Sequence, residues 1–408
     1  MPTVTEFQLF AVDLPFKTAF RHAAAARTTS ESLFLRVGLD SGVDGWGEAL
    51  PRAYVSGESR QDAFTLLRDQ VLPALVGRTF QSLPEVVSFL EKCDGKAPPE
   101  WVRPDVPQTS AWCCVDLALL DTFGRETGQP ASPGGQPSRG SLERYRYSGV
   151  VSAGRGWPYA KSLLKMRAFG FPHIKLKLGQ DGAPQAARTA RRLLGRRVDL
   201  RVDANMAWGV EQALEVIQQL RTVGIRSFEQ PIAAGDLSGL ARLVAESSAG
   251  IVVDEGLTDR ESLQALISHQ ACTGANVRIS KCGGLVGAYA RCREALAGGP
   301  HAPGWLPGRR VVVAVGGAPV AAVGPRPVAA RGPVRRRLLR PAPAPGGPRI
   351  TADPVRLRRP SSATSPRSRA GGPGRSGDAA AVGGRPGNDR IARERGDRCR
   401  ESDGCCCG

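Results

Sequence analysis

Five polar residues recur at nearly equal spacing in the middle of the chain, and this regularity limits the possible folds more than any other feature. The intervals are 26, 26, 25 and 27 residues in the series Lys177, Asp203, Glu229, Asp254 and Lys281. Each residue ends a short apolar segment that is followed by an amphipathic one, an alternation typical of parallel βαβ units. Equal intervals indicate equal units, and barrels of such units carry their chemistry at the carboxyl ends of the strands. The spacing therefore favours a TIM (β/α) barrel over an open sheet.

The apolar segments predict six strands, each followed by a helix. The strands are expected near residues 146–151, 173–178, 199–204, 225–229, 251–255 and 275–281. We assign residues 142–300 to this α/β barrel. With about six βα units, the predicted barrel is incomplete by two.

Residues 1–128 mix strands and helices without that alternation. The β-rich segment 33–39 and a second strand from Gly45 predict a hairpin of an antiparallel sheet. Helical patterns follow at about 60–76, 84–92 and 110–126. The Pro-, Gly- and Ser-rich stretch 129–141 is expected to be a linker. We therefore predict an N-terminal α+β domain ahead of the barrel.

Residues 301–408 differ sharply in composition. They contain 18 Gly, 15 Pro, 21 Arg, no Lys and 7 acidic residues, and so carry +14 of the formal charge of +18. Residues 1–300 hold 35 basic and 31 acidic side chains, a near-neutral +4. The basicity belongs to the last quarter, so it does not mark the whole chain as a nucleic-acid binder. Because such a segment buries little apolar surface, we expect a disordered tail.

The same composition is typical of a coding sequence read out of frame. Translation one nucleotide later from Trp305 permits a plausible seventh barrel strand and helix, followed by an eighth strand and a Pro-rich ending. We therefore interpret residues 301–408 as out of frame. A barrel that ends after six strands has two open edges and an exposed interior. We expect the chain as written to fold poorly and to be inactive.

Three of the strand-end residues are carboxylates: Asp203, Glu229 and Asp254. Oxygen ligands at one rim of a barrel suit Mg²⁺, which keeps some waters and accepts substrate oxygens. The alternative is that each acid caps the helix that follows. Equal spacing and flanking lysines favour the metal site.

Lysines lie on both sides of these carboxylates. Lys175 and Lys177 alternate within one strand, so both face the barrel interior, where ammonium groups are costly unless function requires them. Each cation lowers the pKa of the other, which leaves one able to act as a neutral base. Lys281 ends the sixth strand, opposite the second across an eight-stranded barrel. This arrangement suits removal of a proton next to a carboxylate on one face and its return on the other, with a metal stabilising the enediolate.

These motifs together resemble the enolase superfamily. They are Lys175-x-Lys177, Asp203-x-Asn205, Glu229-Gln230-Pro231, Asp254-Glu255 and Ser280-Lys281-Cys282-Gly283-Gly284. The muconate-lactonizing-enzyme subgroup, and dipeptide epimerases within it, are most similar, over about residues 3–300. The resemblance implies a capping domain over a modified TIM barrel, Mg²⁺ held by the three carboxylates, and Lys177 and Lys281 as the acid/base pair. It also implies that Lys175 assists Lys177 and touches the substrate carboxylate, and that Asn205 binds substrate.

Two segments of the N-terminal domain match the substrate-covering loops of that subgroup. They are Phe20-Arg21-His22 and Tyr54-Val55-Ser56-Gly57-Glu58. The resemblance implies substrate-binding roles for Arg21, His22 and Tyr54, and ordinary surface polarity is the alternative. Such loops vary widely, which lets one scaffold serve many acids.

The resulting hypothesis is an isomerase that epimerises or racemises a small carboxylate, a dipeptide or an N-acyl amino acid. Dipeptide epimerases usually hold the substrate ammonium with Asp-x-Asp at strand eight, a pair that this chain lacks there. Within the superfamily, a cycloisomerase or a syn-dehydratase is the alternative, since either needs only one lysine as base. From another class, the basic tail could bind nucleic acid, but it lacks the lysines and interleaved aromatics that single-strand binding favours.

The remaining expectations concern location and assembly. No run of 18 apolar residues occurs, so no membrane-spanning helix is expected, and the first residues do not resemble a secretory signal. Six of the ten Cys lie in residues 1–300 without metal spacing, which suits reduced thiols. We predict a cytoplasmic protein with no nucleic-acid or membrane partner, and a homo-oligomer if the barrel is complete.

Overall fold

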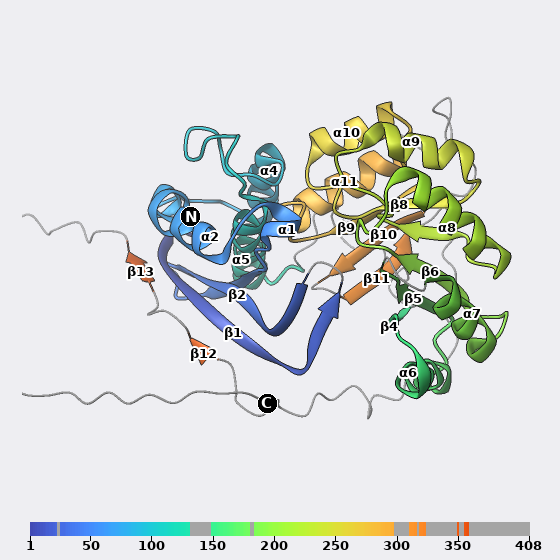
Figure 1. Cartoon of the computed structure of the whole chain (residues 1–408). Helices are drawn as coiled ribbons and strands as arrows, with labels where there is room; N and C mark the ends of the chain where they lie inside the picture. The colour runs from blue at the N-terminus through green and yellow to red at the C-terminus, as the bar shows by residue number, and fades with distance from the viewer. Residues whose placement is uncertain are drawn as a thin grey trace, which may run out of the picture. The chain divides into compact units, whose positions relative to one another are not determined.

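The computed structural model describes most of the chain up to residue 358. The described residues are 1–22, 25–130, 148–179, 183–297, 310–315, 318–323, 349–350 and 355–358. All of them belong to one compact unit, Met1–Pro360. Within it the strands form two sheets, one antiparallel and one largely parallel (Figure 1).

The N-terminal sheet is built on a long strand that the sequence patterns did not predict. Its strands β1 (Val4–His22), β2 (Ala25–Leu39) and β3 (Asp44–Ala49) are antiparallel neighbours. The predicted hairpin is confirmed, with β2 and β3 paired from Leu33↔Ala49 to Gly38↔Asp44. Two short strands from the C-terminal quarter, β12 (Arg349–Ile350) and β13 (Val355–Arg358), pair with β1.

Helices pack on this sheet, and all but the short α1 lie where the helical patterns predict them. They are α1 (Ala53–Ser56), α2 (Arg60–Leu66), the π-helical turn η1 (Leu67–Val71), α3 (Leu72–Leu75), α4 (Leu83–Cys93) and α5 (Thr109–Thr127). Helix α5 lies directly on β3. The approach is so close that a Cβ built at Gly47 would lie 2.0 Å from the Cys114 carbonyl oxygen. Only glycine permits so close an approach of helix and strand backbones.

The second sheet contains the six predicted βα units. Its strand order is β11-β10-β9-β8-β7-β6-β5-β4, parallel from β4 to β10. The six strands lie within a few residues of the predicted ranges: β4 (Ser148–Ser152), β5 (His173–Lys177), β6 (Asp199–Asp203), β7 (Ser227–Glu229), β8 (Gly250–Val253) and β9 (Gly274–Arg278). One helix follows each: α6 (Gly156–Ala168), α7 (Ala183–Leu194), α8 (Val210–Thr222), α9 (Leu237–Glu246), α10 (Arg260–Ser268) and α11 (Leu285–Ala297).

Beyond residue 300 the structure differs from the expected featureless tail. Strand β10 (Arg310–Val315) runs parallel to β9, and β11 (Ala318–Val323) returns antiparallel to β10. The valine run 311–313 explains this, because β-branched residues favour strands. Strand β9, expected to be an open edge, is therefore paired, and the edges of the described sheet are β11 and β4. The expectations for residues 324–348 and 359–408, and for the linker from residue 131 onward, lie outside the described residues.

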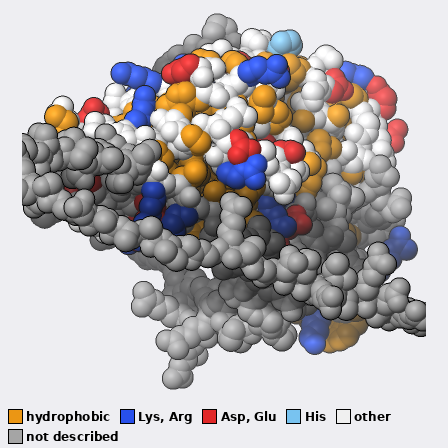
Figure 2. Space-filling model, turned by 90° about the vertical axis from the view of Figure 1, so that its left-hand side faces the viewer, with side chains coloured by type: hydrophobic (Ala, Val, Ile, Leu, Met, Phe, Trp, Pro, Cys, Tyr) orange, Lys and Arg blue, Asp and Glu red, His pale blue; other side chains and the backbone are white. Residues whose placement is uncertain are grey.

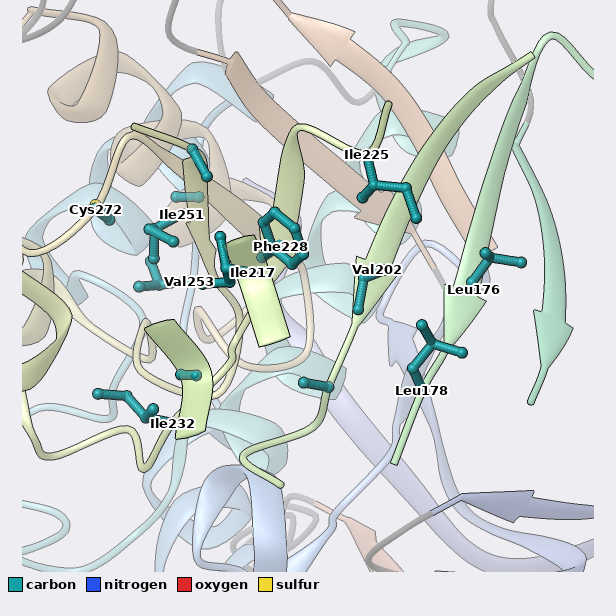
Figure 3. Packing of buried hydrophobic residues seen from close by; sticks show 14 of the residues in the cluster. Leu176, Leu178, Val202, Ile217, Ile225, Phe228, Ile232, Ile251, Val253 and Cys272 are labelled. Atoms are coloured by element: carbon teal, nitrogen blue, oxygen red, sulfur yellow. The ribbon is translucent and has the colours of Figure 1, made fainter. Parts of the chain in front are cut away.

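Strict alternation in the parallel sheet separates an apolar face from a polar one. Leu176 and Leu178, Val202, Phe228, and Ile251 and Val253 are buried against the helices in one hydrophobic cluster (Figure 3). The residues between them therefore point to the opposite face, because successive side chains of a strand alternate. Every lysine and carboxylate that the sequence places on these strands lies on that second face.

A second hydrophobic cluster fills the N-terminal domain, and buried polar groups tie that domain to α11. Asp116 of α5 accepts hydrogen bonds from the backbone N–H groups of Leu285, at 2.7 Å, and Val286, at 3.3 Å. These are donors of the first turn of α11 that lack an intrahelical partner. The buried Arg291 of α11 also forms an ion pair with Asp94, at 2.5 Å. Two acidic residues of the N-terminal domain thus anchor α11, one at its first turn and one at its middle.

Charged side chains of both signs are interspersed over the described part of the face in Figure 2. This agrees with the near-neutral balance of residues 1–300. Among the described residues, no helix is long and apolar enough to cross a membrane.

Candidate active site

The two lysines of β5 reach different neighbours on the polar face of the sheet. Lys175 is buried, and its Nζ lies 2.7 Å from Asp203 Oδ2 and 2.7 Å from Glu229 Oε1. Lys177 is nearer the rim, where its Nζ donates to Asn205 Oδ1 at 3.0 Å and lies 3.5 Å from Asp203 Oδ2. Burial lowers the pKa of Lys177, the Lys175 ammonium adds to this effect, and Asp203 opposes it. Lys177 is therefore the more accessible of the pair, and its lowered pKa favours deprotonation.

The three carboxylates predicted to bind metal are all buried, and each lies against cations. Glu229 accepts hydrogen bonds from Lys175, and from Asn276 Nδ2 at 2.9 Å, and lies 3.3 Å from Arg201 Nε. Burial alone would raise the pKa of Glu229, but the charges of Lys175 and Arg201 hold it at about 2. The group is consequently an anion at any physiological pH.

Asn205 links the carboxylate cluster to the next acidic side chain. Its Nδ2 donates to Glu255 Oε1 at 3.1 Å, while its Oδ1 accepts from Lys177. Burial raises the pKa of Glu255, and the charge of Asp203 raises it further. Asn205 also has a φ of 46°, a conformation that costs free energy in non-glycine residues and occurs often at functional sites.

The sixth strand contributes an arginine that the sequence analysis did not single out. Arg278 is the last residue of β9, and its guanidinium contacts Asp254 Oδ2 while 29% of its side chain stays exposed. Lys281 lies beyond the strand, and its Nζ donates to the Asp254 backbone carbonyl, to Asp254 Oδ1 at 2.7 Å and to the Asn276 carbonyl at 3.3 Å. Burial, with the nearby Arg278 guanidinium, lowers the pKa of Lys281.

The predicted substrate-loop residues belong to the N-terminal domain. Tyr54 lies on α1 with 37% of its surface exposed. Arg21 and His22 lie in β1, paired with Ala26 and Ala25, and their side chains are outside the described residues. Their substrate roles stay predictions.

Three site residues beyond the predicted set share one signal, namely alternation. Arg201, Asn276 and Arg278 have the strand parity that faces the carboxylates, since their neighbours Val202, Ala275 and Val277 are in the apolar cluster. Reading back in steps of two from Asp203 would have found Arg201. Asn276 and Arg278 have the opposite parity to Lys281, the predicted end of their strand, so finding them required the observed end of β9 at Arg278.

The donor set of the three carboxylates fits a hard cation. Asp203 Oδ2, Glu229 Oε2 and Asp254 Oδ2 are fully buried and accept no hydrogen bond, although each lies against a lysine or arginine. Buried anionic oxygens in that state suit Mg²⁺. As they stand, no three His, Cys, Asp or Glu side chains in the described part of the chain converge closely enough to hold a metal.

Two family models match successive parts of the chain. Residues 4–133 match the mandelate racemase/muconate lactonizing enzyme N-terminal domain, and residues 159–328 match the enolase C-terminal domain-like family. The L-Ala-D/L-Glu epimerase of Bacillus subtilis is 30% identical over 280 residues, 67% of this chain and 71% of that protein. The N-succinyl-L-Arg/Lys racemase of Bacillus cereus is 24% identical over 297 residues, 72% of this chain and 76% of that protein.

Solved structures agree in fold. The N-succinyl Arg/Lys racemase from Bacillus cereus has a TM-score of 0.66 at 22% identity, covering 77% of this chain and 80% of its own. A dipeptide epimerase from Cytophaga hutchinsonii, complexed with Mg and D-Ala-L-Val, has a TM-score of 0.64 at 23% identity, covering 76% and 79%. The sequence matches and the two-sheet architecture lead to one conclusion: this chain belongs to the muconate-lactonizing-enzyme subgroup of the enolase superfamily.

Proposed function

We propose that this chain is an Mg²⁺-dependent isomerase that transfers a proton at the carbon next to a carboxylate. The substrate would be a dipeptide or an N-acyl amino acid, which the enzyme epimerises or racemises. The observation that carries the proposal is Lys177, a partly accessible ammonium beside Asp203 and Asn205 whose pKa burial lowers. A lysine with a lowered pKa is suited to serve as a general base at neutral pH.

The chain's own residues have separable parts in this chemistry. Asp203, Glu229 and Asp254 would hold Mg²⁺, which as a Lewis acid would stabilise the charge that develops on the substrate carboxylate. Lys177 Nζ would accept the α-proton, and Asn205 would hold that nitrogen in place through the 3.0 Å hydrogen bond. Lys175, bound to both Asp203 and Glu229, would keep those two carboxylates oriented and meet the substrate carboxylate. The sequence assigns return of the proton on the other face to Lys281.

The choice of substrate class rests on the relatives. One of them is named for racemising N-succinylated arginine and lysine and another for epimerising an Ala-Glu dipeptide. Both named substrates are amino acids that are acylated on nitrogen and keep a free carboxylate. We infer the same class here, with Arg21, His22 and Tyr54 contributing to its recognition.

A reaction that uses a single base is the second candidate, and one observation favours it. All three protons of the Lys281 ammonium are donated to protein acceptors. A cycloisomerase or a syn-dehydratase needs Lys177 alone.

We also propose that the two domains span residues 1–128 and 142–300. The protein would be a homo-oligomer and would be located in the cytoplasm. Size-exclusion chromatography with light scattering would measure the oligomeric state.

Solvent exchange tests the reaction directly. The purified chain is incubated in D₂O with MgCl₂ and either N-succinyl-L-lysine or L-Ala-L-Glu, and loss of the α-proton signal is followed by NMR. We expect exchange, reduced at least about 100-fold by Lys177→Met and unchanged by Lys161→Met on the exposed side of α6. Exchange with inversion would indicate a racemase or epimerase, and exchange with retention a one-base reaction. Absence of exchange, or full exchange by Lys177→Met, would contradict the proposal.

A further inference from the structure

Two residues of the sequence motifs have no part in the proposed reaction. They are Gln230, which follows the carboxylate that ends β7, and Glu255, which follows the carboxylate after β8. Gln230 is fully buried, and only 9% of Glu255 is exposed. Buried polar side chains are normally hydrogen-bonded, and their partners show what they hold in place.

The hydrogen bonds of Glu255 lead to the proposed base through Asn205. Asn205 Nδ2 donates to Glu255 Oε1 at 3.1 Å, and Asn205 Oδ1 accepts from Lys177 Nζ at 3.0 Å. The nitrogen of a side-chain amide only donates, its oxygen only accepts, and a carboxylate only accepts. Glu255 therefore selects the orientation of Asn205 in which the amide oxygen faces Lys177.

Gln230 holds the backbone on which Glu255 lies. Its Oε1 accepts from the N–H groups of Asp254, at 2.9 Å, and Gly256, at 3.1 Å, and its Nε2 donates to the Ile232 carbonyl at 3.0 Å. Asp254 and Gly256 are the residues on either side of Glu255. The chain is thus fixed immediately before and after Glu255, which keeps that side chain next to Asn205.

The orientation of the Asn205 amide matters most when Lys177 is the neutral amine that takes up a proton. Loss of one proton leaves its nitrogen with two N–H groups and a lone pair. An amide oxygen beside it accepts from an N–H and leaves the lone pair free, whereas an amide NH₂ in the same place would donate to the lone pair and block it. The amide torsion of asparagine is roughly two-fold, so rotation by about 180° exchanges the two ends. A neutral lysine can pair with either end, and Glu255 decides between them.

We propose that Glu255 is a positioning residue that keeps the lone pair of Lys177 free by fixing the Asn205 amide, and that Gln230 holds Glu255 in place. This inference rests on the proposed function, because it concerns the base of that reaction. The role requires a hydrogen-bond acceptor and not a charge. Glu255 Oε2 is buried and accepts no hydrogen bond from any other described residue. The NH₂ group of a glutamine could therefore occupy its place while the glutamine oxygen faces Asn205.

Side-chain ¹⁵N labelling of asparagine tests the orientation without any turnover. The chain contains three asparagines, Asn205, Asn276 and Asn388, so the NMR spectrum of the full chain with MgCl₂ holds three side-chain NH₂ pairs, and Asn205→Ala assigns one of them. In Glu255→Met we expect the Asn205 pair to shift upfield and to exchange faster with water, because its acceptor is lost. In Glu255→Gln the pair should stay as in the unsubstituted chain.

Asn276 is the internal control of this measurement. Its Nδ2 donates to Glu229 Oε1 at 2.9 Å, away from Glu255, so its signals should not change in either variant. Unchanged Asn205 signals in Glu255→Met would overturn the proposal. Equal changes at Asn205 and Asn276 would also overturn it, because they would indicate a general loosening of the site.

Kinetic variants measure the consequence for the reaction. Glu255→Met should lower kcat for α-proton exchange about tenfold with KM unchanged, since a hydrogen bond to a charged group is lost, and Glu255→Gln should stay within about threefold of the unsubstituted chain. Glu215→Met, on the exposed side of α8, is the matched control. Because Glu255 acts through Asn205, Glu255→Met should add no further loss to that of Asn205→Ala. Additive losses in the double variant, or a Glu255→Gln as slow as Glu255→Met, would refute the assignment.

The proposed function and this inference fail in different ways. If the unsubstituted chain exchanges no α-proton but the Asn205 signals respond as expected, the proposed reaction is wrong and the positioning of Asn205 stands. If exchange occurs and the Asn205 signals do not respond to Glu255→Met, the reaction stands and the positioning role is wrong.

Discussion

Replacement of Gly283 by alanine should destabilise the fold far more than its backbone conformation alone requires. Gly283 lies in the turn between β9 and α11 with a φ of 73°, and a Cβ built there would lie 1.8 Å from the Gly95 carbonyl oxygen. Gly170, between α6 and β5, has a φ of 72° and nothing within 4 Å of such a Cβ. The two positions therefore share the left-handed conformation and differ only in the space around them.

This matched pair separates two costs. Alanine in the left-handed region costs about 1–2 kcal/mol at either position. At Gly283 the methyl group would also overlap backbone that cannot rotate away, and overpacking adds about 1–3 kcal/mol or more. We therefore expect Gly170→Ala to lower the free energy of unfolding by about 1–2 kcal/mol and Gly283→Ala by roughly twice that.

Urea denaturation followed by far-UV circular dichroism measures both losses against the unsubstituted chain. Because Gly283 is two residues from Lys281, Gly283→Ala should also slow α-proton exchange, whereas Gly170→Ala should not. Equal losses of stability in the two variants would show that the close approach of Gly283 to Gly95 contributes nothing, and would refute the reasoning.

Three further outcomes are expected. Burial raises the pKa of Asp116 from 3.8 to about 7, so the folded state holds that proton more tightly and this group's contribution to stability falls as pH rises through that range. The stability of Asp116→Asn relative to wild type should therefore increase between about pH 4 and pH 7, measured by urea titration, and a constant difference would contradict this. Chelation of Mg²⁺ by EDTA should abolish α-proton exchange and lower the melting temperature, because a ligand of the folded state stabilises it; unaltered exchange would exclude a metal requirement. Resequencing the gene across the codons for His301 to Trp305 should reveal a gained or lost base, and an intact frame would rule out the out-of-frame interpretation.

The expected inactivity of the chain as written rested on a barrel with two open edges. In the structure β10 pairs with β9 from Arg310↔Gly274 to Ala314↔Arg278, so the described sheet extends beyond six strands and ends at β11 and β4. The exchange assay decides between this expectation and the proposed activity.

Local chain properties were sufficient to locate most elements. Alternating apolar residues and equal spacing predicted β4 to β9 and their helices, because the hydrophobic period of a strand or helix can be recognised within a short stretch of sequence. The same periodicity placed Lys175 and Lys177 on one face of β5, as observed. Strand β1 was not predicted. Strand β10 was not predicted either, because the average composition of residues 301–408 conceals its short valine run.

Contacts between distant residues could not be inferred in this way. Arg278 and Lys281 both lie about one repeat interval after Asp254, so spacing does not distinguish them. Only the folded structure shows that 1% of the Lys281 side chain is exposed, against 29% of the Arg278 side chain. The link from Asp116 to Leu285 likewise joins residues 169 positions apart. Sequence periodicity determines which face of a strand a residue occupies. Burial and hydrogen-bond saturation depend on what the rest of the chain brings to that face, and this the tertiary structure alone decided.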